Sequence, residues 1–228
     1  MYAESVRTPA FLFALSAVCS GCASDYNTVR LKQKKGSDIL SLRTQHYLQT
    51  DGDHVQEIER GERMAEFNAS RRTSGNGDIE LTLKVTLRLY EDDAPPALAG
   101  QLDAGGKNVP LQIAKWSSTD LQEKVTVLDT GQRPGTNGAL TSEVQAQTGY
   151  ITFGKPTAAG SVQRRWRVYS GEISDAESFV QALRLAGLAR VRLLVGTTEA
   201  KIEFKPNQIK AWQRFARGEP DKISRQGD

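Results

Sequence analysis

The sequence has few of the side chains on which metal centres and nucleophilic catalysis depend. Its 228 residues include only two cysteines and two histidines. Two cysteines cannot build a disulfide framework, and His46 and His54 lie eight positions apart, which is unlike the spacing of zinc ligands. The G-x-S-x-G turn that carries a nucleophilic serine does not occur. We therefore expect no bound metal and no cofactor.

The chain also lacks an excess of charge of one sign. It has 30 Lys and Arg residues and 27 Asp and Glu residues, so the formal net charge is +3. Domains that bind nucleic acid carry a concentrated basic surface and a much more alkaline isoelectric point. Arg165, Arg167, Trp166 and Tyr169 mix cations with aromatics, as sites for single strands do, but their alternation predicts a half-buried strand. We expect no nucleic-acid partner.

Long hydrophobic runs are missing, apart from one near the N-terminus. Residues 11–18 are apolar except for Ser16. Eight residues are too few to cross a bilayer, which takes about 20 helical residues. Because Arg7 precedes it, the run has the features of the central region of an export signal. The sequence therefore predicts that residues 1–21 are a signal peptide.

The apolar run is followed by Cys19, Ser20, Gly21 and Cys22. This segment resembles the lipobox of bacterial lipoproteins, although Cys19 stands where that pattern usually has Leu. The resemblance implies cleavage before Cys22, attachment of a diacylglyceryl group to its sulfur, and loss of Cys19 from the mature chain. Ala23 after the cysteine implies sorting to the outer membrane. Ordinary signal cleavage near Ala23 is the alternative that the small residues also fit.

The lipoprotein resemblance implies one functional residue, Cys22, as the site of lipid attachment. The expected location is the cell envelope, in the outer membrane and facing the periplasm. Two acyl chains are enough for stable anchoring, whereas one is marginal. The expected partners are the membrane, through the lipid at Cys22, and an envelope protein.

Residues 22–36 are expected to be the lipid anchor and a flexible tether that holds the domain just off the membrane. Two interpretations of the cations in this segment remain open. Arg30, Lys32, Lys34 and Lys35 fit an anionic lipid surface, or they belong to an edge strand whose lysines discourage edge-to-edge pairing.

Alternation of apolar and polar residues predicts an antiparallel β-sheet in residues 37–218. The clearest run is 79–90, where every second residue is apolar, which is typical of a strand with one buried face. Glycine-rich turns follow several such runs, and their regular spacing suggests a sandwich or a barrel-like sheet. The other expected strands cover residues 65–69, 98–102, 109–113, 121–128, 144–153 and 162–169. Residues 129–142 are expected to form a long surface loop.

Two amphipathic helices are predicted near the C-terminus. Ser174 and Glu177 form a capping box at the start of the first helix, and Gly187 allows a left-handed stop after it. Pro206 suits the first turn of the second helix, which stops near Gly218. A strand hairpin over residues 191–204 separates the helices. The expected fold is therefore a single β-rich α+β domain over residues 37–218, followed by a polar tail at 219–228.

Other candidate sites fail on chemical grounds. Residues 149–155 have the glycine and lysine spacing of a phosphate-binding loop, but Pro156 lacks the hydroxyl that binds magnesium. Asp51, Asp53 and Glu57 do not follow the spacing of a calcium loop, because Val55 takes the third alternate ligand position. The carboxylates of Glu91, Asp92 and Asp93 stand at a predicted strand end, where they serve to terminate it.

The sequence thus favours a cell-envelope lipoprotein that acts as a binding, scaffold or assembly module without catalytic activity. One alternative is an envelope hydrolase that uses carboxylates, with residues 129–142 over a cleft. The other is a component of a secretion or pilus assembly. A hydrolase should show a concave pocket with converging carboxylates of shifted pKa, whereas a scaffold should show an exposed apolar patch or an open strand edge.

Overall fold

The computed structural model describes residues 26–50, 62–129 and 157–225, which form one 11-stranded sheet and two helices. The strands are β1 (Arg30–Lys34), β2 (Ser37–Thr50), β3 (Met64–Ser74), β4 (Ile79–Tyr90), β5 (Pro96–Ala104), β6 (Lys107–Gln112), β7 (Ser117–Asp129), β8 (Thr157–Glu172), β9 (Ala189–Val195), β10 (Thr198–Glu203) and β11 (Lys222–Arg225). The helices are α2 (Ala176–Leu185) and α3 (Pro206–Arg217).

The sheet is mainly antiparallel, as the sequence predicts. Its strands follow the order β6-β5-β9-β10-β2-β3-β4-β8-β7, while β1 pairs with β2 and, in parallel, with β11. In the part of the chain that the structure describes, β6 and β7 are the free ends of this order, so the sheet stays open. The mainly β, α+β class is therefore confirmed.

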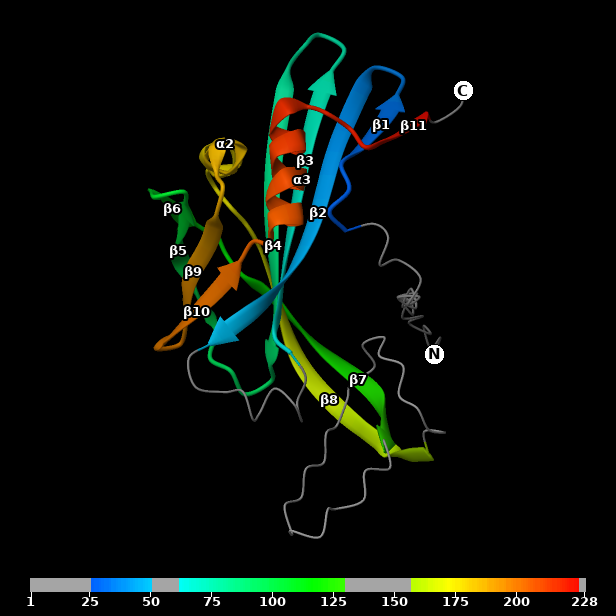
Figure 1. Ribbon diagram of the computed structural model, residues 1–228, viewed down its shortest axis with the longest axis vertical. Coiled ribbons are helices and arrows are strands. Elements are labelled where there is room, and N and C mark those ends of the chain that lie inside the picture. Colours follow the sequence, from blue (N-terminus) through cyan, green and yellow to red (C-terminus); the bar gives the residue numbers. More distant parts are fainter. Residues whose placement is uncertain (1–25, 51–61, 130–156, 226–228) are drawn as a thin grey trace, which may run out of the picture.

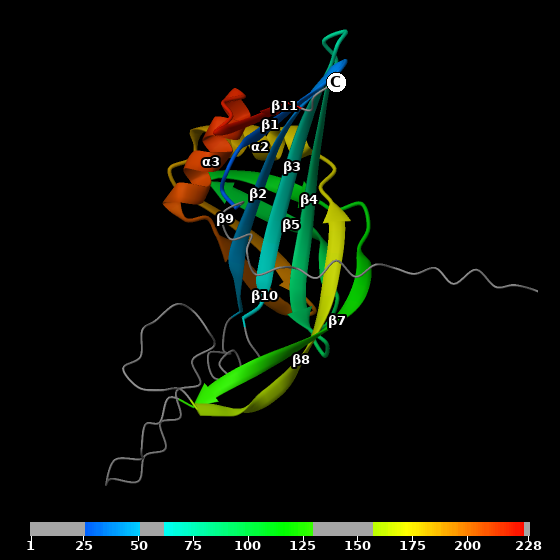
Figure 2. The ribbon, with the colours of Figure 1, turned by 90° about the vertical axis from the view of Figure 1, so that its right-hand side faces the viewer.

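The sheet changes direction along the long strand β2. The first residues of β2, up to Ser41, pair with β1, and its last residues, from Leu48, pair with β10. Because a strand twists about its own axis, the hydrogen-bonding edge at one end of this 14-residue strand is rotated relative to the edge at the other end. Strands β5, β6, β9 and β10 therefore turn away from β2, β3 and β4 (Figures 1 and 2). Helices α2 and α3 contact each other and lie on the inner face of the bend.

The inner face carries the hydrophobic core. Every second residue of β2, β3 and β4 points inward, which produces the alternation seen in the sequence. Aromatic side chains from the sheet and from both helices meet at its centre: Phe67 stacks on Phe179 at 5.6 Å between ring centroids, and Phe179 meets the ring of Trp212 edge-on at 5.5 Å. Burial of these rings attaches the helices to the sheet.

The two helices begin and end close to where the sequence places them, with two corrections. Asp175, not Ser174, caps α2, because its carboxylate accepts a hydrogen bond from the backbone N–H of Ser178. After α2 the chain continues through Ala186 in an extended conformation, so the predicted left-handed stop at Gly187 is wrong. Gly218 does end α3 with a positive φ of 78°. Neither described helix is long and apolar enough to span a bilayer.

The predicted tether and polar tail are both wrong in the part that the structure describes. Residues 30–34 are strand β1 and residues 222–225 are strand β11, and the two strands pair. Asp221 joins them, since its carboxylate accepts from the N–H of Val29 at 2.8 Å and pairs with Arg214 at 2.9 Å. Residues 30–34 are therefore a strand and not a tether, but β11 pairs along their outer side, so β1 is not the edge of the sheet. The described parts of the domain, residues 26–50, 62–129 and 157–225, extend beyond the predicted 37–218 at both ends.

Strands β7 and β8 extend beyond the sheet as a two-stranded arm (Figures 1 and 2). Strand β8 pairs with β4 only as far as Trp166, whereas its pairing with β7 continues to Thr157. An isolated pair of strands has little stability of its own. The predicted strand at 144–153 and most of the predicted loop at 129–142 lie outside the described residues.

Candidate binding groove

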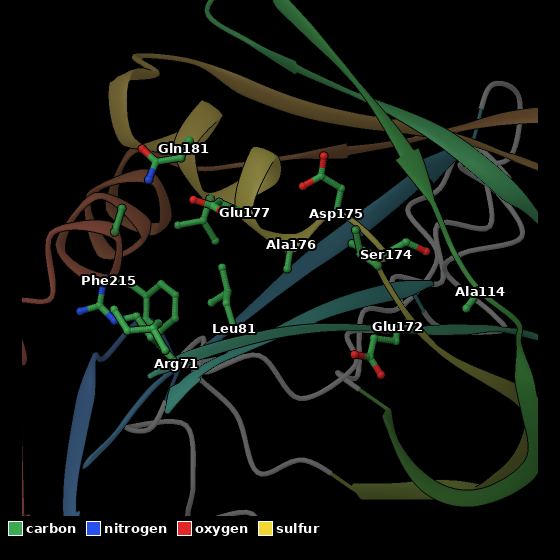
Figure 3. Close-up of a pocket in the computed structure, with 14 residues that line it drawn as sticks. Arg71, Leu81, Ala114, Glu172, Ser174, Asp175, Ala176, Glu177, Gln181 and Phe215 are labelled. Atoms are coloured by element: carbon green, nitrogen blue, oxygen red, sulfur yellow. The ribbon is translucent and has the colours of Figure 1, made fainter. Parts of the chain in front are cut away.

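A groove lies between the two helices and the first half of β4, with a cavity volume of about 730 Å³ (Figure 3). This size is in the range of ligand-binding pockets in proteins. Its apolar lining consists of Ile79, Leu81, Ala114, Ile173, Ala176, Val180, Phe215 and Ala216. Ile79 remains 66% exposed, so the groove presents apolar surface to solvent.

The groove exists because β8 covers only part of β4. Pairing between the two strands begins at Lys84 and Glu172, so residues 79–83 of β4 have β3 on one side and no strand on the other. The chain leaves β8 after Glu172 and enters α2, whose N-terminal turn forms the opposite wall. Ala176 and Val180 from the apolar stripe of α2 face the uncovered part of β4.

The uncovered edge of β4 has free hydrogen-bonding capacity. The backbone C=O of Leu83 accepts from the N–H of Ile173 at 2.9 Å, so the polar groups of Leu83 point to the β8 side. Because these groups alternate along a strand, those of Ile79 and Leu81 point to the same side. No strand of the described chain pairs with them there. Two residues thus present backbone donors and acceptors at the edge of an apolar groove.

The charged side chains of the groove lie at its ends. Arg71 lies beside Phe215, with its guanidinium against Gly218 at the C-terminus of α3, where a cation is favourable (Figure 3). Asp175 and Glu177 lie at the start of α2, whereas Glu172 pairs with Lys84 and its side chain points away from the groove (Figure 3). The pKa of Asp175 is held below its usual range because the carboxylate accepts hydrogen bonds from Ser178. One cation against the two carboxylates of Asp175 and Glu177 makes the groove slightly acidic in a chain whose net charge is positive.

The mixed run of cations and aromatics seen in the sequence lies at the base of the arm, away from the groove. The Tyr90 and Trp166 rings stack at 5.4 Å between centroids, and the guanidiniums of Arg63 and Arg88 cover their outer faces at 4.1 and 4.5 Å. Such cation–aromatic contacts are stabilising. Residues 162–169 are a strand, as predicted, but Trp166 and Tyr169 are both buried although they lie on opposite faces of it, so the predicted exposed face for Tyr169 is wrong. The four stacked side chains of Arg63, Tyr90, Trp166 and Arg88 connect β8, at the base of the arm, to β4 of the sheet.

Two of the carboxylates considered for hydrolysis form hydrogen bonds or ion pairs at the base of the arm. Asp93 accepts two hydrogen bonds from the guanidinium of Arg63, both at 2.8 Å, and one from the N–H of Tyr90. Glu91 lies 3.6 Å from Arg165. Asp93 therefore terminates β4, as the sequence predicts, because its carboxylate takes the hydrogen bond of the last backbone N–H of the strand.

His46 is a packed core residue. It lies between the rings of Phe67 and Phe204, and both of its ring nitrogens have hydrogen-bond partners. In the part of the chain that the structure describes, no group of three or more His, Cys, Asp and Glu residues is placed to hold a metal. Cys22, His54, the acidic residues 51–57 and the glycine-rich residues 149–155 lie outside the described residues.

Sequence reasoning missed the groove and its open edge. The alternation at Ile79 and Leu81 assigned both side chains to a buried face, and nothing local shows that β8 ends beside Lys84. No local signal could have shown it: the neighbouring strand β8, with 16 residues, is longer than β4 with 12, and only the register between them leaves residues 79–83 uncovered. Comparison of the chain with protein-family models, with curated proteins and with solved structures finds no match.

Proposed function

We propose that this chain is a cell-envelope lipoprotein, held in the outer membrane by lipid at Cys22 and facing the periplasm, that binds a partner polypeptide without catalysing a reaction. The lipobox-like residues before Cys22 support the anchor. Tyr26, four residues after Cys22 in the sequence, contacts the domain through its hydroxyl, which donates to Glu66 at 3.2 Å, so the proposed anchor is close in sequence to the folded part.

The open edge of β4 beside the groove is the observation that carries the binding function. An extended peptide can add to an exposed strand edge, where main-chain hydrogen bonds supply affinity and alternate side chains enter a groove. Ile79 and Leu81 offer the backbone groups, and Val180 faces them from the opposite wall. An edge that leads into a groove holds such a segment better than a flat edge does.

The proposed occupant is an extended segment that carries basic side chains. The groove has more carboxylates than cations, and Asp175 and Glu177 are both solvent-exposed, so both are accessible to the cations of a partner. A secretion or pilus component is a narrower form of this proposal, because strand addition joins the subunits of such assemblies. The described residues supply no comparable observation in favour of a carboxylate hydrolase.

The groove is tested with two synthetic pentapeptides, acetyl-Lys-Val-Lys-Val-Lys-amide and its Glu-Val-Glu-Val-Glu counterpart. We expect the basic peptide to slow amide hydrogen exchange at Ile79 and Leu81, since their N–H groups become hydrogen-bonded. The acidic peptide should bind at least about fivefold more weakly. Hydrogen exchange followed by mass spectrometry, with peptide titrations, measures both effects.

Ile79→Lys and Leu185→Lys form a matched pair for this test, because both leucine-sized side chains are largely exposed, at 66% and 78%. Only the first adds a cation to the groove, so it alone should weaken binding of the basic peptide. Equal weakening by Leu185→Lys, or unchanged exchange at Ile79 and Leu81 with saturating peptide, would show that the groove is not the binding site.

Lipid attachment is tested by metabolic labelling with palmitate in a Gram-negative host. We expect label in the wild-type chain and in Cys19→Ser, because Cys19 is removed by the cleavage, and no label in Cys22→Ser. Intact-mass analysis should show a chain that begins at Cys22 and carries acyl groups. A free thiol at Cys22 in the exported protein contradicts the proposed anchor.

A further inference from the structure

The side of the sheet that faces away from the helices is strongly basic. We call it the outer face, made by β1, β2, β3, β4 and β11. The strand pairings place on it every second residue of each strand, such as Lys32 beside Ile39, Ile39 beside Arg72, and Arg72 beside Glu80. Its charged residues are the cations Arg30, Lys32, Lys34, Arg43, Arg72, Lys84, Arg88 and Lys222 and the carboxylates Glu66 and Glu80.

The cations of the outer face are accessible. Lys32, Lys34, Arg72, Lys84 and Lys222 are all exposed to solvent. One of the two carboxylates, Glu66, is neutralised by Arg43, which donates to both of its oxygens at 2.6 and 2.7 Å. Glu80 lies beside Arg72, and from the neighbouring strands Glu172 lies beside Lys84 and Glu123 lies 3.8 Å from Arg88. Cations still outnumber carboxylates on the face, and they are in excess around β1 and β11, although the net charge of the chain is only +3.

The N-terminal end of the described chain also lies on the outer face. The Tyr26 hydroxyl donates to Glu66 at 3.2 Å, and the guanidinium of Arg43 lies over the Tyr26 ring at 5.0 Å. Four extended residues reach about 14 Å, so Cys22 lies within that distance of Tyr26. This length is comparable to the distance of about 8–10 Å over which charges act at physiological salt.

We propose that the outer face lies on the anionic leaflet in which Cys22 is anchored, so that the groove opens away from the membrane. This inference rests on the lipid anchor proposed above. An anionic lipid surface attracts each nearby Lys or Arg by about a fivefold gain in binding. A lipid attached close to Tyr26 brings the outer face, and not the helices, to that surface.

Protection of a free strand edge does not account for these charges. Lysines on an edge strand discourage pairing with other chains, which explains cations on β1. However, β1 is itself paired with β11 on its outer side, and Arg72 and Lys84 lie on the interior strands β3 and β4. Contact with an anionic surface accounts for cations across all five strands.

The test uses the full-length lipidated chain in vesicles that contain headgroup-nitroxide lipids. A fluorophore is attached in turn through Asn68→Cys, on the outer face between Arg43 and Lys84, and through Gln181→Cys, on the groove side of α2. Both residues are exposed, and Cys22 is blocked by its lipid. In phosphatidylglycerol vesicles we expect at least about threefold stronger quenching at residue 68 than at residue 181, and a smaller difference in phosphatidylcholine.

Two triple variants with the same net charge provide the control. Lys32→Glu, Arg72→Glu and Lys84→Glu together should abolish the difference in quenching, whereas Lys107→Glu, Arg184→Glu and Lys210→Glu, all exposed and away from the outer face, should leave it intact. Equal quenching at both positions of a chain that has inserted its lipid overturns the orientation and leaves the anchor standing. A chain that carries no lipid at Cys22 overturns the anchor and the orientation together.

Discussion

Trp212→Ala is expected to lower the free energy of unfolding by about 3–5 kcal/mol, the cost typical of removing a large buried aromatic side chain. Trp212 has no exposed surface and lies where α3 meets both the sheet and α2. Its ring contacts Phe179 and Phe215 edge-on at 5.5 and 5.9 Å, and its indole N–H donates to the Thr44 hydroxyl at 3.3 Å. The substitution leaves a cavity at the junction of all three. Urea unfolding followed by circular dichroism measures the loss.

Trp212→Phe separates packing from hydrogen bonding in this prediction. Phenylalanine keeps most of the buried aromatic contact with Phe179 and removes the indole donor, so we expect a smaller loss of about 1–2 kcal/mol. If Trp212→Ala unfolds at nearly the same urea concentration as the wild type, α3 does not depend on this contact and the description of the core is wrong.

Acid is expected to destabilise the fold by about 3 kcal/mol between pH 6.5 and pH 4, because His46 is buried in its neutral form. Burial among aromatic rings lowers the pKa of His46 from 6.5 to about 4. Between these values the unfolded chain binds a proton at His46 that the folded chain does not. Stability is therefore complete above pH 6.5, falls as the pH falls through this window, and reaches its full loss below pH 4.

The hydrogen bonds of His46 explain why protonation is unfavourable. Its Nδ1 lies 3.1 Å from the backbone C=O of Glu203, so Nδ1 carries the hydrogen and donates it. Nε2 therefore accepts from the Thr44 hydroxyl at 2.9 Å, and that hydroxyl oxygen accepts from Trp212. Every group in this chain of hydrogen bonds is satisfied. A proton on Nε2 would break the bond from Thr44 and place a charge in the core.

His46→Gln provides the control for the acid effect, in a background where His54→Gln removes the other histidine. Unfolding free energies are measured at intervals from pH 7.5 to pH 4 in both chains. The difference between them should shrink steadily as the pH falls, because only the chain that retains His46 loses stability from its protonation. A constant difference across this range means that His46 is not the titrating group.

Much of the fold could be predicted from local patterns. The alternation from Ile79 to Tyr90 indicates β4, and the apolar stripe through Phe179 and Leu183 indicates α2, because both signals come from residues that are close in sequence. The cap of α2 was placed one residue early, at Ser174 instead of Asp175. Both residue types suit a cap, and only the observed hydrogen bond to Ser178 separates them.

Contacts between distant residues could not be predicted in this way. Residues 22–36 and 219–228 are polar and rich in charge, which suggested a tether and a tail. Strand pairing between β1 and β11, with the bond from Val29 to Asp221 across 192 positions, makes parts of both segments into sheet. The composition of a polar segment does not show whether its backbone N–H and C=O groups will form hydrogen bonds with a strand from a distant part of the chain.

The sequence by itself determined the type and approximate bounds of most elements, since periods of two and of 3.6 residues are set by backbone geometry. The alternation around Trp166 also identified a strand there, and the short apolar run before Cys22 is evident in the sequence alone. Only the tertiary structure decided that β8 stops beside Lys84 and leaves Ile79 and Leu81 uncovered. It alone gathered cations from five strands onto one face, because register across a sheet depends on which strands meet and not on any one of them.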